Sequence, residues 1–168
     1  NFEINALNPN GVLLIKVIAP TLMKLPHLEF MELASNEKTN LDVIIGKIKL
    51  SEDFFFEEQR SRQPSVFSVI RQICDLFSSE DPYLGLYGAF GYDLVFQFDN
   101  IEAKHRRNLE QVDCHLYMPV ELVVVDRQKE EAYKIEYHID TPDGMTESWW
   151  NTGEEFEIVS SKFDGKIK

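Results

Sequence analysis

The stretch Leu84–Asn100, LGLYGAFGYDLVFQFDN, carries glycines at 85, 88 and 91, each followed within two residues by an aromatic residue. A dinucleotide-binding loop needs G-x-G-x-x-G between a strand and a helix, and a P-loop needs Lys-Ser or Lys-Thr after its last glycine. This stretch has neither pattern. It predicts a strand over 84–90, whose glycines let another backbone or a ring approach closely, and then a short helix over 92–98. Asp93 would lie in the favourable first turn of that helix.

Before this stretch, residues 66–77 predict an amphipathic helix. Its apolar residues recur at helical spacing: Val66, Ile70, Ile73 and Phe77. Ser65 stands where an N-cap belongs, with a hydroxyl able to accept a bond from a free backbone N–H. Cys74 widens the apolar stripe, so we expect a buried free thiol and no disulfide with Cys114. Free thiols suit a cytoplasmic protein.

After this stretch, residues 115–126 and 132–139 predict an antiparallel hairpin around a polar turn at 127–130. His115 and His138 would face each other across it as a surface pair.

The remaining pattern adds strands, one helix and an irregular end. We expect strands over 2–8, 28–34 and 42–49, and a helix over 12–25 that Pro20 interrupts or kinks. Beyond the run Thr141-Pro142-Asp143-Gly144 the periodicity is lost, and we expect a loop with one strand at 156–159. Because strands and helices do not alternate strictly, the sequence predicts an α+β fold with mainly antiparallel sheets and flanking helices.

Composition excludes some partners. The chain has 168 residues, 43% of them hydrophobic, and a net charge of −12. Phosphate binding needs clustered Lys and Arg, so nucleic acid and anionic membranes are poor partners. The most basic run, Lys104 to Arg107, is short and is interpreted as a solvated loop. No apolar run approaches the roughly 18 residues of a membrane span, and no signal peptide is visible.

The titratable and nucleophilic side chains form no recognisable catalytic pattern in the sequence. The four histidines show no metal-ligand spacing with each other or with the cysteines: His27, His105, His115 and His138. The acidic pairs Glu57-Glu58 and Glu130-Glu131 are neighbours in sequence, so their side chains point apart. No serine stands in a G-x-S-x-G elbow. The residues therefore assign no catalytic, cofactor-binding or metal site.

Three stretches together resemble the N-terminal region of anthranilate synthase component I. They are QRSRQPSVFS at 59–68, LGLYGAFGYDLVFQFD at 84–99 and LYMPVELVVVDRQKEEAYKIEY at 116–137. The opening FEINALNPNGVLLIKVIAPTL fits as well, so the resemblance covers roughly residues 2–139. The first stretch is most similar to the fused form, in which component I and its glutamine amidotransferase share one polypeptide.

The resemblance implies the fold of chorismate-utilising enzymes and a parent reaction. In that reaction chorismate and ammonia, released from glutamine, give anthranilate and pyruvate with the assistance of magnesium. The family's chorismate and magnesium residues lie in a C-terminal catalytic domain, and its Leu-Leu-Glu-Ser feedback motif does not occur in this sequence. The resemblance therefore assigns no catalytic, inhibitor or cofactor residue here.

The chain opens with Asn1 in what reads as mid-strand, so we expect a piece of something longer. Residues 1–140 would be a component I N-terminal-like domain truncated at its N-terminus, and 141–168 an irregular segment of unclear assignment. The expected role is a non-catalytic scaffold or regulatory portion. Its partners would be the chorismate-binding and glutamine amidotransferase domains of the same parent chain, and the question of a homo-oligomer stays open. Six residues are expected to pack against those domains: Tyr87, Gly88, Phe90, Gly91, Tyr92 and Asp93.

Two alternatives stay open. The G-Y-D stretch is shared by related enzymes, so the parent could be an aminodeoxychorismate, isochorismate or phenazine-pathway synthase. A free-standing module that binds a small aromatic ligand would instead predict a closed pocket and a ligand-dependent rise in melting temperature.

Overall fold

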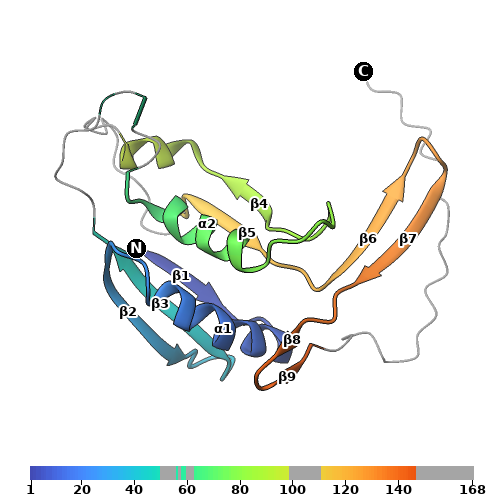
Figure 1. Ribbon diagram of the computed structural model, residues 1–168, viewed down its shortest axis with the longest axis horizontal. Helices are drawn as coiled ribbons and strands as arrows, with labels where there is room; N and C mark the ends of the chain where they lie inside the picture. Colours follow the sequence, from blue (N-terminus) through green and yellow to red (C-terminus); the bar gives the residue numbers. More distant parts are fainter. Residues whose placement is uncertain (50–55, 57, 60–62, 99–110, 147–168) are drawn as a thin grey trace.

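A three-stranded antiparallel sheet in the order β1-β3-β2 forms one side of the molecule (Figure 1). Its strands are β1 (Phe2–Asn5), β2 (Leu28–Ser35) and β3 (Asp42–Ile48). The computed structural model describes residues 1–49, 56, 58–59, 63–98 and 111–146. All three strands were predicted, although β1 ends three residues before the predicted limit.

Helix α1 (Pro9–Leu22) begins earlier and ends earlier than predicted. The turn-forming residues after β1 start this helix: Asn8 is the N-cap, its Oδ1 accepting from the Gly11 N–H at 2.9 Å, and Pro9 occupies the first turn. Of the two expected effects of Pro20, interruption of the helix was wrong, since α1 continues through Pro20 to Leu22. Pro20 is exposed and stands in the last turn, and the Met23 N–H still donates to the Ala19 carbonyl at 3.0 Å.

Helix α2 (Val66–Leu76) was predicted almost to the residue and contacts α1. The core lies between the sheet and these two helices. Its most deeply buried apolar side chains are Ile15 and Leu22 of α1 and Ile44 of β3. Val69 and Ile73 bring α2 into the same cluster.

Cys74 lies on the flank of α2 and is exposed, so the expected burial of its thiol was wrong. The helix buries Val69 and Ile73 on one face, and Cys74 is turned about 100° from Ile73 around the helix axis.

Ser65 is the N-cap of α2, as predicted, and Ser68 stands at the N3 position of a capping box. Ser65 has the extended conformation of an N-cap, but its hydroxyl is buried and has no hydrogen-bond partner among the described residues. The Val66 N–H donates instead to Oε1 of Gln97 at 3.3 Å, and the Ser65 N–H donates to the Ser68 hydroxyl at 3.3 Å. A residue 31 positions away therefore adds an acceptor at the start of α2, beside the local pair Ser65 and Ser68.

Replacing Gln97 should cost more than replacing Ser65. Loss of a capping acceptor costs about 1 kcal/mol, so we expect Gln97→Ala to lower the free energy of unfolding by that amount. Ser65→Ala removes a buried hydroxyl that lacks a partner, so its cost should stay below about 0.5 kcal/mol. Urea denaturation of both variants measures the difference, and a larger loss for Ser65→Ala would contradict this account of the cap.

The predicted strand over 115–126 is two strands with different partners. Strand β5 (Cys114–Tyr117) pairs with β4 (Tyr87–Phe90), while β6 (Glu121–Asp126) pairs with β7 (Glu131–Glu136). Pro119 lies at the break and has no N–H for a continuous ladder. The β6–β7 hairpin was predicted correctly, and in Figure 1 it extends away from the two helices.

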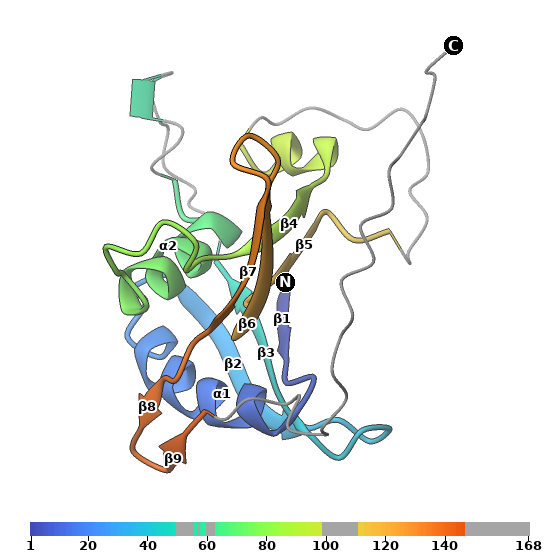
Figure 2. The ribbon, with the colours of Figure 1, turned by 90° about the vertical axis from the view of Figure 1, so that its right-hand side faces the viewer.

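The end of the described chain holds a small hairpin that the sequence did not predict. Strands β8 (Asp140–Thr141) and β9 (Gly144–Met145) flank a two-residue turn and lie beside α1 (Figures 1 and 2). Lys16 of α1 pairs with Asp143 of the turn at 2.9 Å. The expected strand at 156–159 and the basic run at 104–107 lie outside the described residues.

The architecture is therefore α+β with small antiparallel sheets, as predicted. Within the described residues, none of the helices has the length and apolarity needed to cross a membrane.

Candidate packing surface

The glycines of the 84–91 stretch bring β4 and β5 together. In the register, Gly88 stands opposite Leu116, and a Cβ at position 88 would overlap the carbonyl of His115. The Gly91 N–H donates to the Asp113 carbonyl at 2.6 Å, and a Cβ at 91 would lie 2.9 Å from that oxygen. Both glycines therefore serve a neighbouring backbone, as predicted, and the Gly91 amide is already used within the chain.

The two faces of this ribbon differ. Tyr87 pairs with Tyr117 and Ala89 pairs with His115, which places these four side chains on one face because successive side chains alternate. All four are exposed, and the rings of His115 and Tyr117 stack at 4.7 Å. We call this set, Tyr87, Ala89, His115 and Tyr117, the outer face.

The opposite face of the ribbon lies toward α2 and is called the inner face. It is formed by Gly88, Phe90, Cys114 and Leu116. Phe90 stacks on Phe67 of α2 with ring centroids 5.6 Å apart, and Phe67 also meets Phe98 at 5.8 Å. Phe90 nevertheless remains 54% exposed. The structure thus places Tyr87 and Phe90, both expected at the same interface, on opposite faces of the ribbon.

The rest of the predicted set lies on the following turn. Gly91 is the N-cap of the 3₁₀ helix η2 (Tyr92–Gln97), the short helix that the sequence predicted. Tyr92 is its first residue and is 87% exposed. Asp93 lies in the first turn and its Oδ2 accepts from Nε2 of Gln111 at 3.4 Å. Tyr92 is therefore a further exposed aromatic residue, two positions after the end of β4.

His115 and Tyr117 were not among the predicted site residues. The alternation of apolar and polar residues around His115 and Tyr117 is visible in the sequence, but there it predicts one strand over 115–126 paired with 132–139. The expected pairing of His115 with His138 was wrong, since His115 stands opposite Ala89. His138 follows β7, with Nδ1 3.2 Å from the Thr146 carbonyl and Nε2 4.0 Å from Glu136.

Tyrosine hydroxyls attach the β6–β7 hairpin to the segment before β4. The Tyr133 hydroxyl donates to that of Tyr83 at 2.9 Å, and their rings meet edge to face at 6.3 Å. The Tyr137 hydroxyl donates to Oδ2 of Asp81 at 3.2 Å. The hydrogen bond to Tyr83, with desolvation, raises the pKa of Tyr133 from 10.0 to about 12.

This contact should weaken in alkali. A folded-state pKa raised above the unfolded value gives stability that is complete below pH 10 and is lost as the pH rises toward 12. We expect the free energy of unfolding of the wild type to fall more steeply over that interval than that of Tyr133→Phe. Denaturant titrations at successive pH values measure the two slopes, with Tyr92→Phe as control. Equal slopes for wild type and Tyr133→Phe would refute the contact's role.

The described residues offer no metal centre. None of their His, Cys, Asp and Glu side chains form a group of three or more that could hold an ion. Cys114, on the inner face, is a free thiol whose pKa is raised by burial and by the charge of Asp113.

The fold and this surface define a small α+β unit that presents exposed aromatic rings on a two-stranded antiparallel ribbon. Over 146 residues the chain is 41% identical to an anthranilate synthase of Azospirillum brasilense, and the match covers 86% of this chain. The predicted resemblance to anthranilate synthase is thereby confirmed. The chain spans 19% of the length of that relative. No family model matches the chain, and no solved structure matches it.

Proposed function

We propose that this chain is a non-catalytic scaffold and regulatory portion from the N-terminal part of a cytoplasmic anthranilate synthase of the fused type. In this role its outer face and Tyr92 pack against the chorismate-binding domain of the same polypeptide. The parent enzyme would convert chorismate and glutamine to anthranilate, pyruvate and glutamate, with its magnesium held elsewhere.

The observation that carries this proposal is the 41% identity to a relative of which the chain spans 19%. The exposed aromatic side chains of the chain supply a surface for the rest of such a longer polypeptide. Aromatic residues are enriched at protein interfaces because they bury large areas. Two-stranded ribbons are marginally stable by themselves, so β4–β5 and β6–β7 both gain from a further layer.

The direct test is an anthranilate fluorescence assay with chorismate, ammonium and magnesium. We expect no anthranilate above the rate without protein from the 168-residue chain, and restored formation when the remainder of the parent is supplied. Turnover by the chain alone would overturn the non-catalytic role. A different aromatic product from the complete parent would favour one of the related synthases.

A further inference from the structure

One face of the β6–β7 hairpin is apolar and remains exposed. In the register Val123 stands opposite Lys134 and Val125 stands opposite Ala132, so these four side chains share a face. Val123 is 69% exposed, Val125 is 63% exposed, and Ala132 is exposed as well. We call the set Val123, Val125 and Ala132 the valine face.

The lysine on this side of the hairpin is directed away from the valine face. Nζ of Lys134 lies 2.6 Å from a carboxylate oxygen of Glu121 and 2.6 Å from one of Glu136, and these two residues form the pair at the root of the hairpin. Asp126 and Glu131, the pair nearest the turn, alternate to the other side. The valine face therefore carries no charge of its own.

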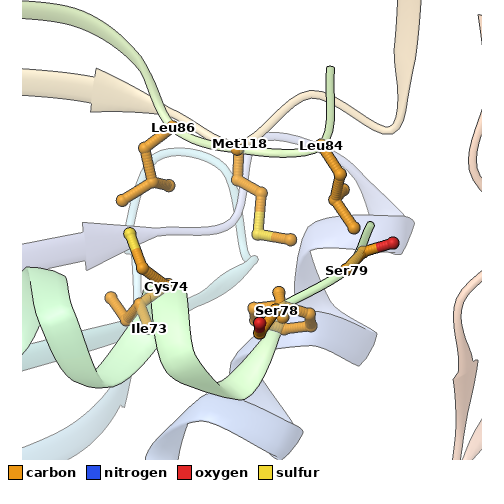
Figure 3. A pocket seen from close by; sticks show the side chains of 9 residues that line it. Ile73, Cys74, Ser78, Ser79, Leu84, Leu86 and Met118 are labelled. Atoms are coloured by element: carbon orange, nitrogen blue, oxygen red, sulfur yellow. The ribbon is translucent and has the colours of Figure 1, made fainter. Parts of the chain in front are cut away.

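The opposite side and the root of the hairpin are attached to the rest of the chain. Tyr133 lies on that opposite side, where its hydroxyl donates to that of Tyr83. At the root, the Tyr137 N–H donates to the Val120 carbonyl at 2.8 Å, and Met118 packs against the core cluster. Figure 3 shows the Met118 side chain directed toward α2. The hairpin is thus held in place with its valine face outward.

The sequence of β6 is typical of a strand that is covered on both sides. Residues 122–125 read Leu-Val-Val-Val, a continuous apolar run. In an antiparallel sheet with one side in water, apolar and polar residues alternate, whereas a continuous apolar run of at least about four residues is typical of a strand buried on both sides. A further layer over the valine face is therefore expected.

Area and charge indicate what supplies that layer. A stable contact between separate proteins buries roughly 800 Å² on each partner, and the valine face alone falls far short of that. The net charge of −12 also opposes the pairing of two copies. A segment of the same polypeptide needs no such area, because covalent linkage keeps it at a high effective concentration. The chain spans 19% of the anthranilate synthase that it matches, so a longer polypeptide would supply such a segment.

We propose that the valine face packs against an apolar surface in the rest of the longer polypeptide. The inference rests on the proposed function, which places the chain within such a polypeptide. It adds a second contact, on a ribbon other than the β4–β5 ribbon that carries the outer face.

Cysteine labelling of the 168-residue chain and of the complete polypeptide tests this contact. Val123→Cys reports on the valine face, and Val112→Cys is the matched control because Val112 is 68% exposed. Mass spectrometry of the peptide that carries each introduced cysteine measures its rate of reaction with a maleimide, and a melting transition verifies that each complete variant is folded. We expect Val123→Cys to react at least about tenfold more slowly in the complete polypeptide, because a covered thiol reacts only after local opening. Val112→Cys should react equally fast in both.

Equal rates for Val123→Cys in the two contexts would overturn the inference. Slow reaction already in the 168-residue chain, faster on dilution, would assign the valine face to a second copy and would overturn it as well. Tyr92→Cys separates this contact from the proposed function. Protection of Tyr92→Cys without protection of Val123→Cys would support the packing of the outer face and remove only the hairpin contact.

Discussion

Gly88→Ala is expected to separate β4 from β5 and to lower the free energy of unfolding by about 2–3 kcal/mol. A methyl group at position 88 would overlap the carbonyl of His115, which belongs to the paired backbone and cannot rotate away. The strands must move apart, so the ladder loses hydrogen bonds as well as contacts. Urea denaturation followed by circular dichroism measures the loss.

Gly85→Ala is the matched control. A Cβ at position 85 meets nothing within 4 Å. Gly85→Ala therefore makes the same change of residue type without the clash that Gly88→Ala creates. It should leave stability unchanged or raise it slightly by restricting the unfolded chain. Equal losses for Gly85→Ala and Gly88→Ala would show that the close approach of β5 is not the reason for glycine at 88.

Ile44→Ala should cost about 2–5 kcal/mol, the largest effect we expect from one core substitution. The Ile44 side chain is fully buried between the sheet and α1, beside Ile15 and Leu22. Removing it leaves a cavity that the two rigid layers fill poorly. Because a typical domain is stable by only about 5–15 kcal/mol, the variant would lose much of its stability.

The next residue provides the comparison. Ile45 lies on the opposite face of β3 and is 41% exposed, so Ile45→Ala should change stability by about 0.5 kcal/mol or less. Urea denaturation of Ile44→Ala and Ile45→Ala measures the loss in free energy of unfolding for each variant. If Ile45→Ala proved as costly as Ile44→Ala, the core would not lie between the sheet and α1.

Local patterns predicted the local elements. The apolar spacing of α2 and the alternation of β7 need only a few neighbouring residues, and both elements were found where expected. Asn8 shows the limit of such reasoning, because turn formers and helix caps are the same residue types. The sequence could not decide which of these roles Asn8–Gly11 would take.

Contacts between distant residues could not be predicted. The pairing of β4 with β5 joins residues 24–30 positions apart. Its register depends on the close approach of two backbones, which leaves no periodic signal in the sequence. The acceptor that Gln97 adds at the start of α2, from 31 positions away, could not be predicted for the same reason. The packing role of 87–93 was inferred from glycine spacing, whereas its division between two ribbon faces required the register.

Tyr92→Asp in two contexts tests most directly the proposed packing of Tyr92 and the outer face against another part of a longer polypeptide. In the 168-residue chain Tyr92 is 87% exposed, so the melting temperature should stay within about 1–2 °C of the wild type. In the complete polypeptide the buried charge should lower the melting temperature by several degrees and reduce anthranilate formation, while Val112→Asp does neither. An unchanged complete protein carrying Tyr92→Asp would contradict the account.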